Sequence, residues 1–192
     1  MAGSGIVFVI SAPSGAGKKT VLDRVFARDG RLAYAVSATT RQPRPGEIDG
    51  KDYVFLGETE FRRRIESGAF VEWAEVHGHL YGTLHEQLDR KLESGMDVVV
   101  EIDVQGMRSL KALRGDLVTV FMMPPSIEEL ERRIRVRGAN DEASIVLRVS
   151  NARMEIDARH EFDYIVVNDV LENAVDDLWA IVRAERRRAS RQ

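Results

Sequence analysis

The segment that most constrains the fold is Ile6–Thr20, in which an apolar run leads through a glycine-bearing loop into a lysine. Ile6–Ile10 is unbroken and rich in β-branched residues, as is typical of a parallel strand covered on both faces. After the loop, apolar residues recur at helical spacing to about Arg28. Strand, glycine-bearing loop, lysine and helix in this order indicate a phosphate-binding loop.

The loop Ser11–Thr20 carries the residue types that hold a phosphate. Gly15 and Gly17 permit the positive φ angles that turn backbone N–H groups toward an anion. Lys18 adds a point charge, and the following helix adds the positive end of its dipole. The residues predicted to contact a bound nucleoside triphosphate here are Pro13, Ser14, Gly15, Ala16, Gly17, Lys18, Lys19 and Thr20.

Two positions depart from the pattern G-x-x-x-x-G-K-[ST]. Ala12 replaces the first glycine, and Lys19 stands where a Ser or Thr hydroxyl would contact Mg²⁺. A register shifted by one residue would recover Lys19-Thr20 but would place Pro13 and Lys18 on the glycine positions. The glycines determine the backbone geometry, so the first register is preferred. Taken alone, the loop is equally compatible with a structural glycine turn.

The rest of the chain alternates short apolar runs with amphipathic stretches, the pattern of an α/β layer architecture. Asp97–Asp103, Leu117–Met123 and Tyr164–Val167 are predicted strands, and a helix is predicted through Trp179 to about Arg188. We expect one domain, 1–192, with a doubly wound parallel core. Its predicted parts are the core (1–36, 90–125 and 161–192), a small antiparallel lobe (37–89) and a helical, arginine-rich segment (126–160).

Composition excludes several classes of protein. The 28 basic and 31 acidic side chains give a net charge of −3, which argues against a nucleic-acid or membrane footprint. The chain has no cysteine, so disulfides, thiol nucleophiles and cysteine-bound metals are excluded. No apolar run is long enough to span a membrane, and the first residues do not form a secretion signal. A cytoplasmic protein is expected.

Several further motifs follow the loop in a fixed order. They are Ser37–Phe55, Phe70–Trp73, Tyr81–Thr83, Glu101–Gly106, Pro124–Ser126, Arg133–Gly138 and Val167–Asp169. Together with the loop, this set resembles the guanylate kinases, of the bacterial, stand-alone type, over nearly the whole chain. The resemblance implies a P-loop NTPase-type fold with a GMP-binding lobe (37–89) and a lid (126–160). It also implies Mg²⁺-dependent transfer of the γ-phosphoryl group of ATP to GMP, and to dGMP, in purine metabolism.

The lobe holds the predicted acceptor site. Arg41 and Arg44, near Tyr53, are suited to grip a phosphate dianion, although a solvated charged loop would have the same composition. Glu72 has a carboxylate that accepts hydrogen bonds only, which suits the N1–H and amino group of guanine; an outward-facing strand glutamate is the alternative. The resemblance implies phosphate contacts from Arg41, Arg44, Tyr53 and Tyr81, and base contacts from Ser37, Glu72 and Thr83.

Carboxylates at the end of the predicted strand 97–103 point to a metal. Asp103 is expected to bind a water of Mg²⁺ or to anchor the acceptor nucleotide, and Glu101 is a weaker candidate. A helix N-cap is an alternative role for Asp103, and both roles are compatible.

The arginines of 126–160 fall into two groups. By resemblance, Arg133, Arg137 and Arg148 reach the donor phosphates as catalytic residues. Arg137 is also expected to stack on adenine, in a pocket lined by Asn168 and Asp169. The other arginines are expected to be solvated and to pair with glutamates; they are Arg132, Arg135, Arg153 and Arg159.

Two other functions compete with the kinase. A guanylate-kinase-like module that binds phosphopeptides without catalysis is favoured by Lys19 and disfavoured by Lys18 and the lid arginines. A kinase for a phosphorylated sugar is disfavoured by Ser37, Glu72 and Thr83. The sequence leaves open whether the chain is a monomer or a homo-oligomer.

Overall fold

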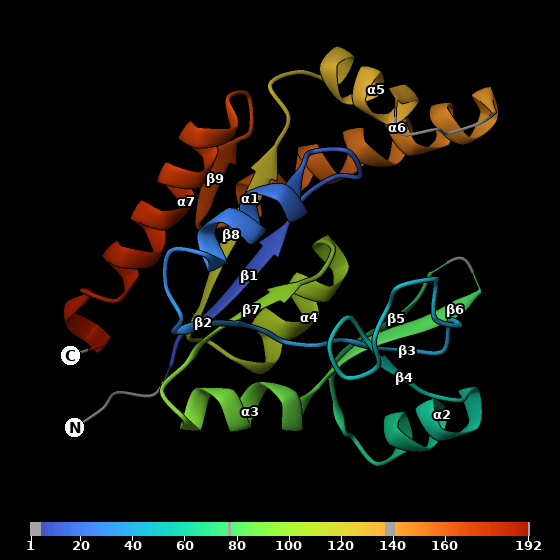
Figure 1. The fold of residues 1–192 in the computed structure, drawn as a ribbon, viewed down its shortest axis with the longest axis vertical. Coiled ribbons are helices and arrows are strands. Elements are labelled where there is room, and N and C mark those ends of the chain that lie inside the picture. Colours follow the sequence, from blue (N-terminus) through green and yellow to red (C-terminus); the bar gives the residue numbers. More distant parts are fainter. Residues whose placement is uncertain (1–4, 77, 137–140, 192) are drawn as a thin grey trace. The chain divides into compact units, whose positions relative to one another are not determined.

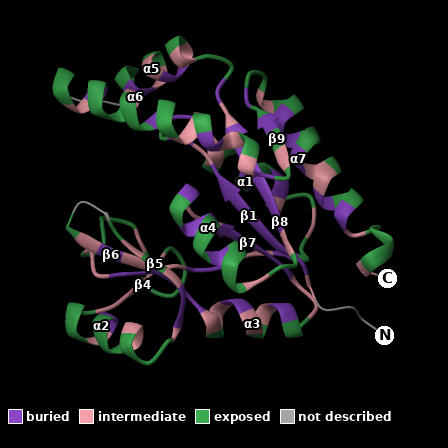
Figure 2. Cartoon of the chain, turned by 180° about the vertical axis from the view of Figure 1, so that it is seen from behind, coloured by how far each residue is buried: buried purple, intermediate pink, exposed green. Residues whose placement is uncertain are grey.

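The apolar run near the N-terminus forms strand β1 (Val7–Ser11), in which every residue is buried. The computed structural model describes residues 5–76, 78–136 and 141–191 of the chain. β1 lies in a five-stranded sheet of order β2-β7-β1-β8-β9. Its other strands are β2 (Leu32–Tyr34), β7 (Asp97–Glu101), β8 (Leu117–Met123) and β9 (Tyr164–Val167). Figure 2 shows β1 in the colour of buried residues, as expected of an inner strand.

The strand order confirms the predicted doubly wound parallel sheet. β2 pairs in parallel with β7, and β8 pairs in parallel with β9. The spans predicted from sequence for β8 and β9 match the structure, and β1 and β7 differ by a residue or two. β2 was not predicted from the sequence, because three residues between loops are too few to show a periodic pattern.

Helices stand before or after the strands of this sheet in the chain. α1 (Lys18–Phe26) follows β1, α3 (His85–Glu93) precedes β7, and α4 (Val104–Leu113) follows β7. α7 (Leu171–Glu185) follows β9 and packs against α1, with ion pairs Arg24–Glu172 and Arg28–Asp176, both of 2.7 Å, between the two helices (Figure 1). A short 3-10 turn, η2 (Ala189–Arg191), follows α7. In the described part of the chain, no helix has the length and apolar character needed to cross a membrane.

A second, four-stranded sheet has the order β4-β3-β6-β5. It consists of β3 (Ala38–Thr39), β4 (Val54–Phe55), β5 (Phe70–Val76) and β6 (His79–Leu84), with α2 (Glu58–Glu66) between β4 and β5 in the chain. The expected antiparallel pairing is observed for β5–β6 and β3–β6, whereas β3 and β4 pair in parallel. The long connection between β3 and β4 makes this possible, because a parallel pair requires a crossover.

The arginine-rich segment forms α5 (Ile127–Val136), α6 (Glu142–Asp157) and the 3-10 turn η1 (Ala158–Glu161). α5 and α6 pack through a small apolar cluster of Leu130, Ile134, Ile145 and Ala152. Asp141 caps α6 by accepting a hydrogen bond from the Ser144 backbone N–H at 2.7 Å.

The chain divides into two compact units. One comprises residues up to Val7, Arg31–Val100 and Gln105–Leu117, and the other comprises Phe8–Gly30, Glu101–Val104 and the chain from Val118. The second sheet and α2 belong to the first unit, while the phosphate loop, α1 and α5–α7 belong to the second. The boundaries of core, lobe and lid given above stay a prediction.

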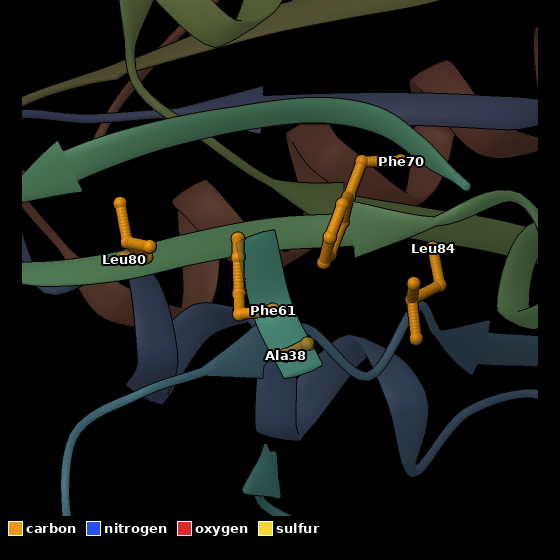
Figure 3. Close-up of a cluster of buried hydrophobic side chains, with 5 residues drawn as sticks. All are labelled: Ala38, Phe61, Phe70, Leu80 and Leu84. Carbon is orange, nitrogen blue, oxygen red and sulfur yellow. The ribbon is translucent and has the colours of Figure 1, made fainter. Parts of the chain in front are cut away.

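The second sheet has its own apolar core on the side of α2 (Figure 3). Phe61 of α2 is fully buried and stacks on Phe70 of β5 with ring centroids 4.3 Å apart. Ala38, Leu80 and Leu84 complete the cluster. Because strand side chains alternate, packing these residues inward presents Tyr81 and Thr83 on the opposite face of β6.

This core gives a stability prediction. Phe61→Ala should lower the free energy of unfolding by about 3–5 kcal/mol, because it removes a buried aromatic ring and leaves a cavity. Leu113→Ala, at a side chain that is 64% exposed, is the control and should change it by less than about 1 kcal/mol. Denaturant unfolding measures both. A loss below about 1 kcal/mol for Phe61→Ala would show that this cluster is not the core of the unit.

Candidate functional site

The loop between β1 and α1 has the backbone that anion binding requires. Gly15 and Gly17 have φ angles of 93° and 85°, in the left-handed region that only glycine adopts without strain. The Ala16 N–H donates to the Pro13 carbonyl at 3.0 Å, which closes the turn. Gly17 is the N-cap of α1, so helix and dipole begin at Lys18. This geometry agrees with the preferred register, in which Gly17 and Lys18 occupy the last glycine and the lysine of the pattern.

Lys18 and Lys19 point in different directions. The Lys18 ammonium lies 3.3 Å from Glu101 Oε2, at the carboxyl end of β7. Lys19 has a side chain that is 82% exposed and pairs along α1 with Asp23 at 3.4 Å. Lys18 therefore carries charge at the loop, and the Lys19 side chain runs away from it.

Asn168, immediately after β9, contacts the loop directly. Its side-chain amide donates to the Ala16 carbonyl at 2.7 Å, and its backbone N–H donates to the Met123 carbonyl at 2.7 Å. Its own carbonyl accepts a hydrogen bond of 3.2 Å from Arg133 Nη1, and Arg133 Nε donates to Glu129 Oε1 at 2.8 Å. Asn168 thus joins the loop, β8 and an arginine of α5.

A cavity of about 300 Å³ opens beside this group. Its lining residues are Gly15, Gly17, Thr20, Arg132, Arg133, Val136, Asn168, Asp169 and Leu171. The structure therefore brings loop residues together with Arg133, Asn168 and Asp169, as the sequence predicted for a donor nucleotide. All of these lie in the second unit.

Three further arginines of the segment 126–160 can be compared with their predicted roles to different extents. Arg132 pairs with Glu129 at 2.7 Å as expected of a solvated arginine, but it also lines the cavity, which the sequence did not indicate. Arg148 is exposed on α6. The predicted role of Arg137 lies outside the described residues.

Two more carboxyl groups, those of Asp103 and Glu155, interact with each other, and Glu155 also interacts with Lys18. Asp103 is exposed and immediately precedes α4. Glu155 of α6 was not singled out from the sequence. Burial, and then the negative charge of Asp103, raise the pKa of Glu155 to about 7, while the charge of Lys18 opposes this shift.

The residues around Lys18 fit a hard cation that keeps most of its water. In residues 5–76, 78–136 and 141–191, no three acidic or histidine side chains gather closely enough to hold a metal ion by themselves. Mg²⁺ is commonly bound through one or two carboxylates, with waters and substrate phosphates completing its shell. Glu101 and Asp103 supply oxygen ligands of that kind.

The first unit carries a second polar cluster, on β5 and β6. Glu72 pairs in register with Thr83, whose hydroxyl donates to Glu72 Oε1 at 2.7 Å. A β-bulge lies between Phe70 and Glu72. Without it, Glu72 would share the core face with Phe70, because residues two apart point the same way. The bulge instead places Glu72 beside the fully buried Thr83, on the face that also carries Tyr81.

Arg41 forms the centre of a cluster with two tyrosines. Its guanidinium lies 5.4 Å from the ring centroid of Tyr53, which makes an edge contact with Tyr81 at 6.1 Å. Hydrogen bonding to Glu47 first, and also to Tyr81, raises the pKa of Arg41. The predicted phosphate residues Arg41, Tyr53 and Tyr81 are thus brought together.

Glu47 holds this cluster in place. It accepts hydrogen bonds from Arg41 Nη2 at 2.8 and 3.0 Å, and from the Arg44 backbone N–H at 2.7 Å. Its pKa is lowered by the Arg41 hydrogen bonds first and by the Arg44 N–H second. The Arg44 side chain is exposed, and the half-buried Ser37 accepts the Val54 N–H through its carbonyl at 2.9 Å.

Comparison with known proteins identifies the family of the chain. The family model described as guanylate kinase matches residues 5–185. The chain is 48% identical to a guanylate kinase of Thermotoga maritima over 97% of its own length and 90% of that protein. It is 46% identical to one of Caldanaerobacter subterraneus, over 97% and 91% of the two chains. The crystal structure of guanylate kinase from Anaplasma phagocytophilum superposes with a TM-score of 0.78 at 34% identity, covering 99% of this chain and 90% of that one.

The chain belongs to the guanylate kinase family. This membership confirms the resemblance on which the sequence analysis relied, and the chain is accordingly an enzyme with the P-loop NTPase fold. The roles of individual residues rest on the geometry given above and stay predictions.

Three carboxylates for which the sequence predicted no role are Glu47, Glu129 and Glu155. The first two each hold an arginine predicted to bind phosphate. Glu129 and Arg133 are four residues apart on a helix, a spacing that allows an ion pair, and this was the one available sequence signal. The contacts of Glu47 span three and six residues within one loop, whereas the setting of Glu155 depends on the tertiary structure.

The raised pKa of Glu155 predicts how stability varies with pH. The folded protein keeps a proton on Glu155 that the unfolded chain releases above about pH 4.5. The free energy of unfolding should therefore fall as pH rises from about 4.5 to about 7. Glu155→Gln removes this loss. After allowance for solvent screening, the variant should gain on the order of 1 kcal/mol over the original chain at pH 8, and almost nothing at pH 5.

Denaturant unfolding at the two pH values measures the difference. Glu66→Gln, at an exposed glutamate of α2, is the control and should track the original chain at both. Equal stability of Glu155→Gln and the original chain at pH 8 would contradict the buried setting of Glu155.

Proposed function

We propose that the chain transfers the γ-phosphoryl group of ATP to GMP, giving ADP and GDP, with Mg²⁺, in the purine nucleotide metabolism of the cytoplasm. The observation that carries this proposal is the presence of two separate polar clusters, each suited to one nucleotide. One combines the phosphate loop with Lys18 and Arg133. The other comprises Arg41 with Tyr53 and Tyr81, and the Glu72–Thr83 pair on the face of the second sheet that also carries Tyr81.

GMP is the acceptor in this proposal. The Glu72 carboxylate accepts hydrogen bonds from guanine N1–H and N2–H, while adenine presents an acceptor at N1 and is disfavoured. Thr83 supports Glu72, and Ser37 adds a hydroxyl contact to the base. Arg41, Arg44, Tyr53 and Tyr81 bind the phosphate through charged and neutral hydrogen bonds. We include dGMP as an acceptor, because these residues are assigned to base and phosphate only.

ATP is bound at the phosphate loop. The N–H groups of the loop and the Lys18 ammonium hold its phosphates, and the cavity beside Asn168 and Asp169 takes the adenosine part. Arg133, with Arg137 and Arg148, stabilises charge on the transferred group. The attacking GMP phosphate oxygen is already anionic, so the reaction needs no general base.

Asp103 is the residue proposed to hold Mg²⁺, through water, with Glu101 near it. When bound, the ion neutralises charge on the donor phosphates. Lys18 supplies the protein's own positive charge at the loop, and its ion pair with Glu101 keeps that charge in position.

A coupled assay of ADP release with GMP, dGMP, AMP and CMP tests the proposed function. Turnover with GMP and dGMP, and much slower turnover with AMP and CMP, is the expected result. Binding of GMP without ADP release would instead identify a guanylate-kinase-like binding module.

Specificity is predicted to depend on Glu72. Glu72→Gln should lower kcat/KM for GMP by at least about tenfold, because an amide presents a donor to one of the guanine N–H groups and leaves it unpaired. The KM for ATP should stay within about twofold. Glu75→Gln, at an exposed glutamate on the other face of the same strand, is the matched control and should leave both constants unchanged. Unaltered GMP kinetics in Glu72→Gln would remove Glu72 from the base site.

Lys19, at the position where the pattern has Ser or Thr, predicts how turnover depends on the Mg²⁺ concentration. A serine at position 19 would offer an oxygen to Mg²⁺, whereas Lys19 offers only donors and points along α1. Lys19→Ser should therefore reach half-maximal turnover at lower Mg²⁺ concentration, with equal or higher kcat. Lys19→Ala, which removes the charge without adding a hydroxyl, separates the two effects in the same titration. Loss of activity in Lys19→Ser would make Lys19 a catalytic residue.

A further inference from the structure

Asn168 differs from the other residues assigned to the donor site in that its side chain is bound to the loop itself. The residue is 6% exposed, and its amide donates to the Ala16 carbonyl at 2.7 Å. The two residues are 152 positions apart in the sequence. The contact was not expected, because the sequence assigned Asn168 to the adenine pocket.

The same amide fills the space beside Gly17. A Cβ atom built on Gly17 would overlap the Asn168 side-chain nitrogen, and Gly17 has the left-handed φ of 85°. Position 17 therefore excludes a side chain for two independent reasons. The amide packs against the loop where its backbone turns into α1.

The contact also sets the orientation of one peptide group. In a trans peptide, the carbonyl of one residue and the N–H of the next point in opposite directions. All described peptide bonds of the chain are trans. Holding the Ala16 carbonyl on Asn168 therefore directs the Gly17 N–H away from Asn168, at a position where the phosphate loop needs an inward-facing donor.

The backbone of Asn168 adds a second constraint. Its N–H is bound to the Met123 carbonyl of β8, so the residue continues the β8–β9 pairing beyond the end of β9. Its carbonyl accepts from Arg133, which Glu129 holds from the other side. The residue that orients the loop is thus fixed to the sheet and also contacts an arginine of α5.

From this arrangement we infer that Asn168 is a positioning residue for the donor phosphates, which acts by fixing the Ala16–Gly17 peptide so that the Gly17 N–H faces the phosphate. The inference rests on the proposed function for the identity of the donor. It assigns to Asn168 a role that does not depend on the base, unlike the adenine contact predicted from sequence. Asn168 does not touch the reacting atoms in this role.

The role predicts equal effects on donors with different bases. Asn168→Ala and the isosteric Asn168→Asp both remove the amide donor, and the aspartate also sets a carboxylate against a carbonyl. Each should lower kcat/KM at least about tenfold for ATP and, by the same factor, for ITP, which lacks the 6-amino group. The KM for GMP should stay within about twofold. Asn173→Ala, at an exposed position on α7, is the matched control and should leave all constants unchanged.

A binding measurement separates this inference from the proposed function and from misfolding. Calorimetric titration with inorganic tripolyphosphate, which has no base or sugar, should give a Kd at least about tenfold weaker for Asn168→Ala than for Asn173→Ala. Circular dichroism of the same samples should show an intact fold. This readout does not require turnover, so it tests Asn168 even where GMP phosphorylation is absent.

These measurements distinguish a contact to adenine from a role in positioning the donor phosphates. A loss confined to ATP, with ITP and tripolyphosphate unaffected, would assign Asn168 to adenine recognition and overturn the inference. Unchanged tripolyphosphate binding in a folded Asn168→Ala protein would also overturn it. Parallel losses for ATP, ITP and tripolyphosphate support it.

Discussion

A loop can surround an anion only if several backbone N–H groups converge on it, and this requires peptide orientations that a side chain at every position would not allow. Gly15 and Gly17 satisfy the requirement through left-handed φ angles, and Asn168 fixes the peptide between Ala16 and Gly17. The surrounding structure depends on this arrangement. β1 is buried and anchors one end of the loop, α1 begins at the other end, and β9 ends where Asn168 reaches the loop.

Three of the cations assigned to a phosphate are paired with a carboxylate of the protein. Glu101 holds Lys18, Glu47 holds Arg41, and Glu129 holds Arg133. A partly buried charge without a partner is costly, so these pairs stabilise the fold while they set the direction of each side chain. A phosphate then meets cations that are already oriented, and less side-chain entropy is lost on binding.

The proposed base site depends on strand register. The bulge between Phe70 and Glu72 lets Phe70 enter the core of the second sheet while Glu72 pairs with Thr83 on the other face. One added residue in β5 therefore serves stability and recognition together. Since a shift by one residue moves every side chain to the other face, this irregularity is a condition for the site.

The sequence by itself determined the features that depend on local chemistry. Two glycines and a lysine after a buried strand, together with the motifs that follow, predicted the phosphate loop, and the runs Leu117–Met123 and Tyr164–Val167 match their strands to the residue. Only the tertiary structure decided the strand β2, the parallel pairing of β3 with β4, the bulge, and the contacts of Glu155 and Asn168. These features join residues through folding rather than through spacing: Asn168 meets Ala16 because β9 and β1 end in the same unit, although 152 positions separate them. Periodicity records which face of an element is apolar, and it holds no information about which distant side chain completes a hydrogen bond there.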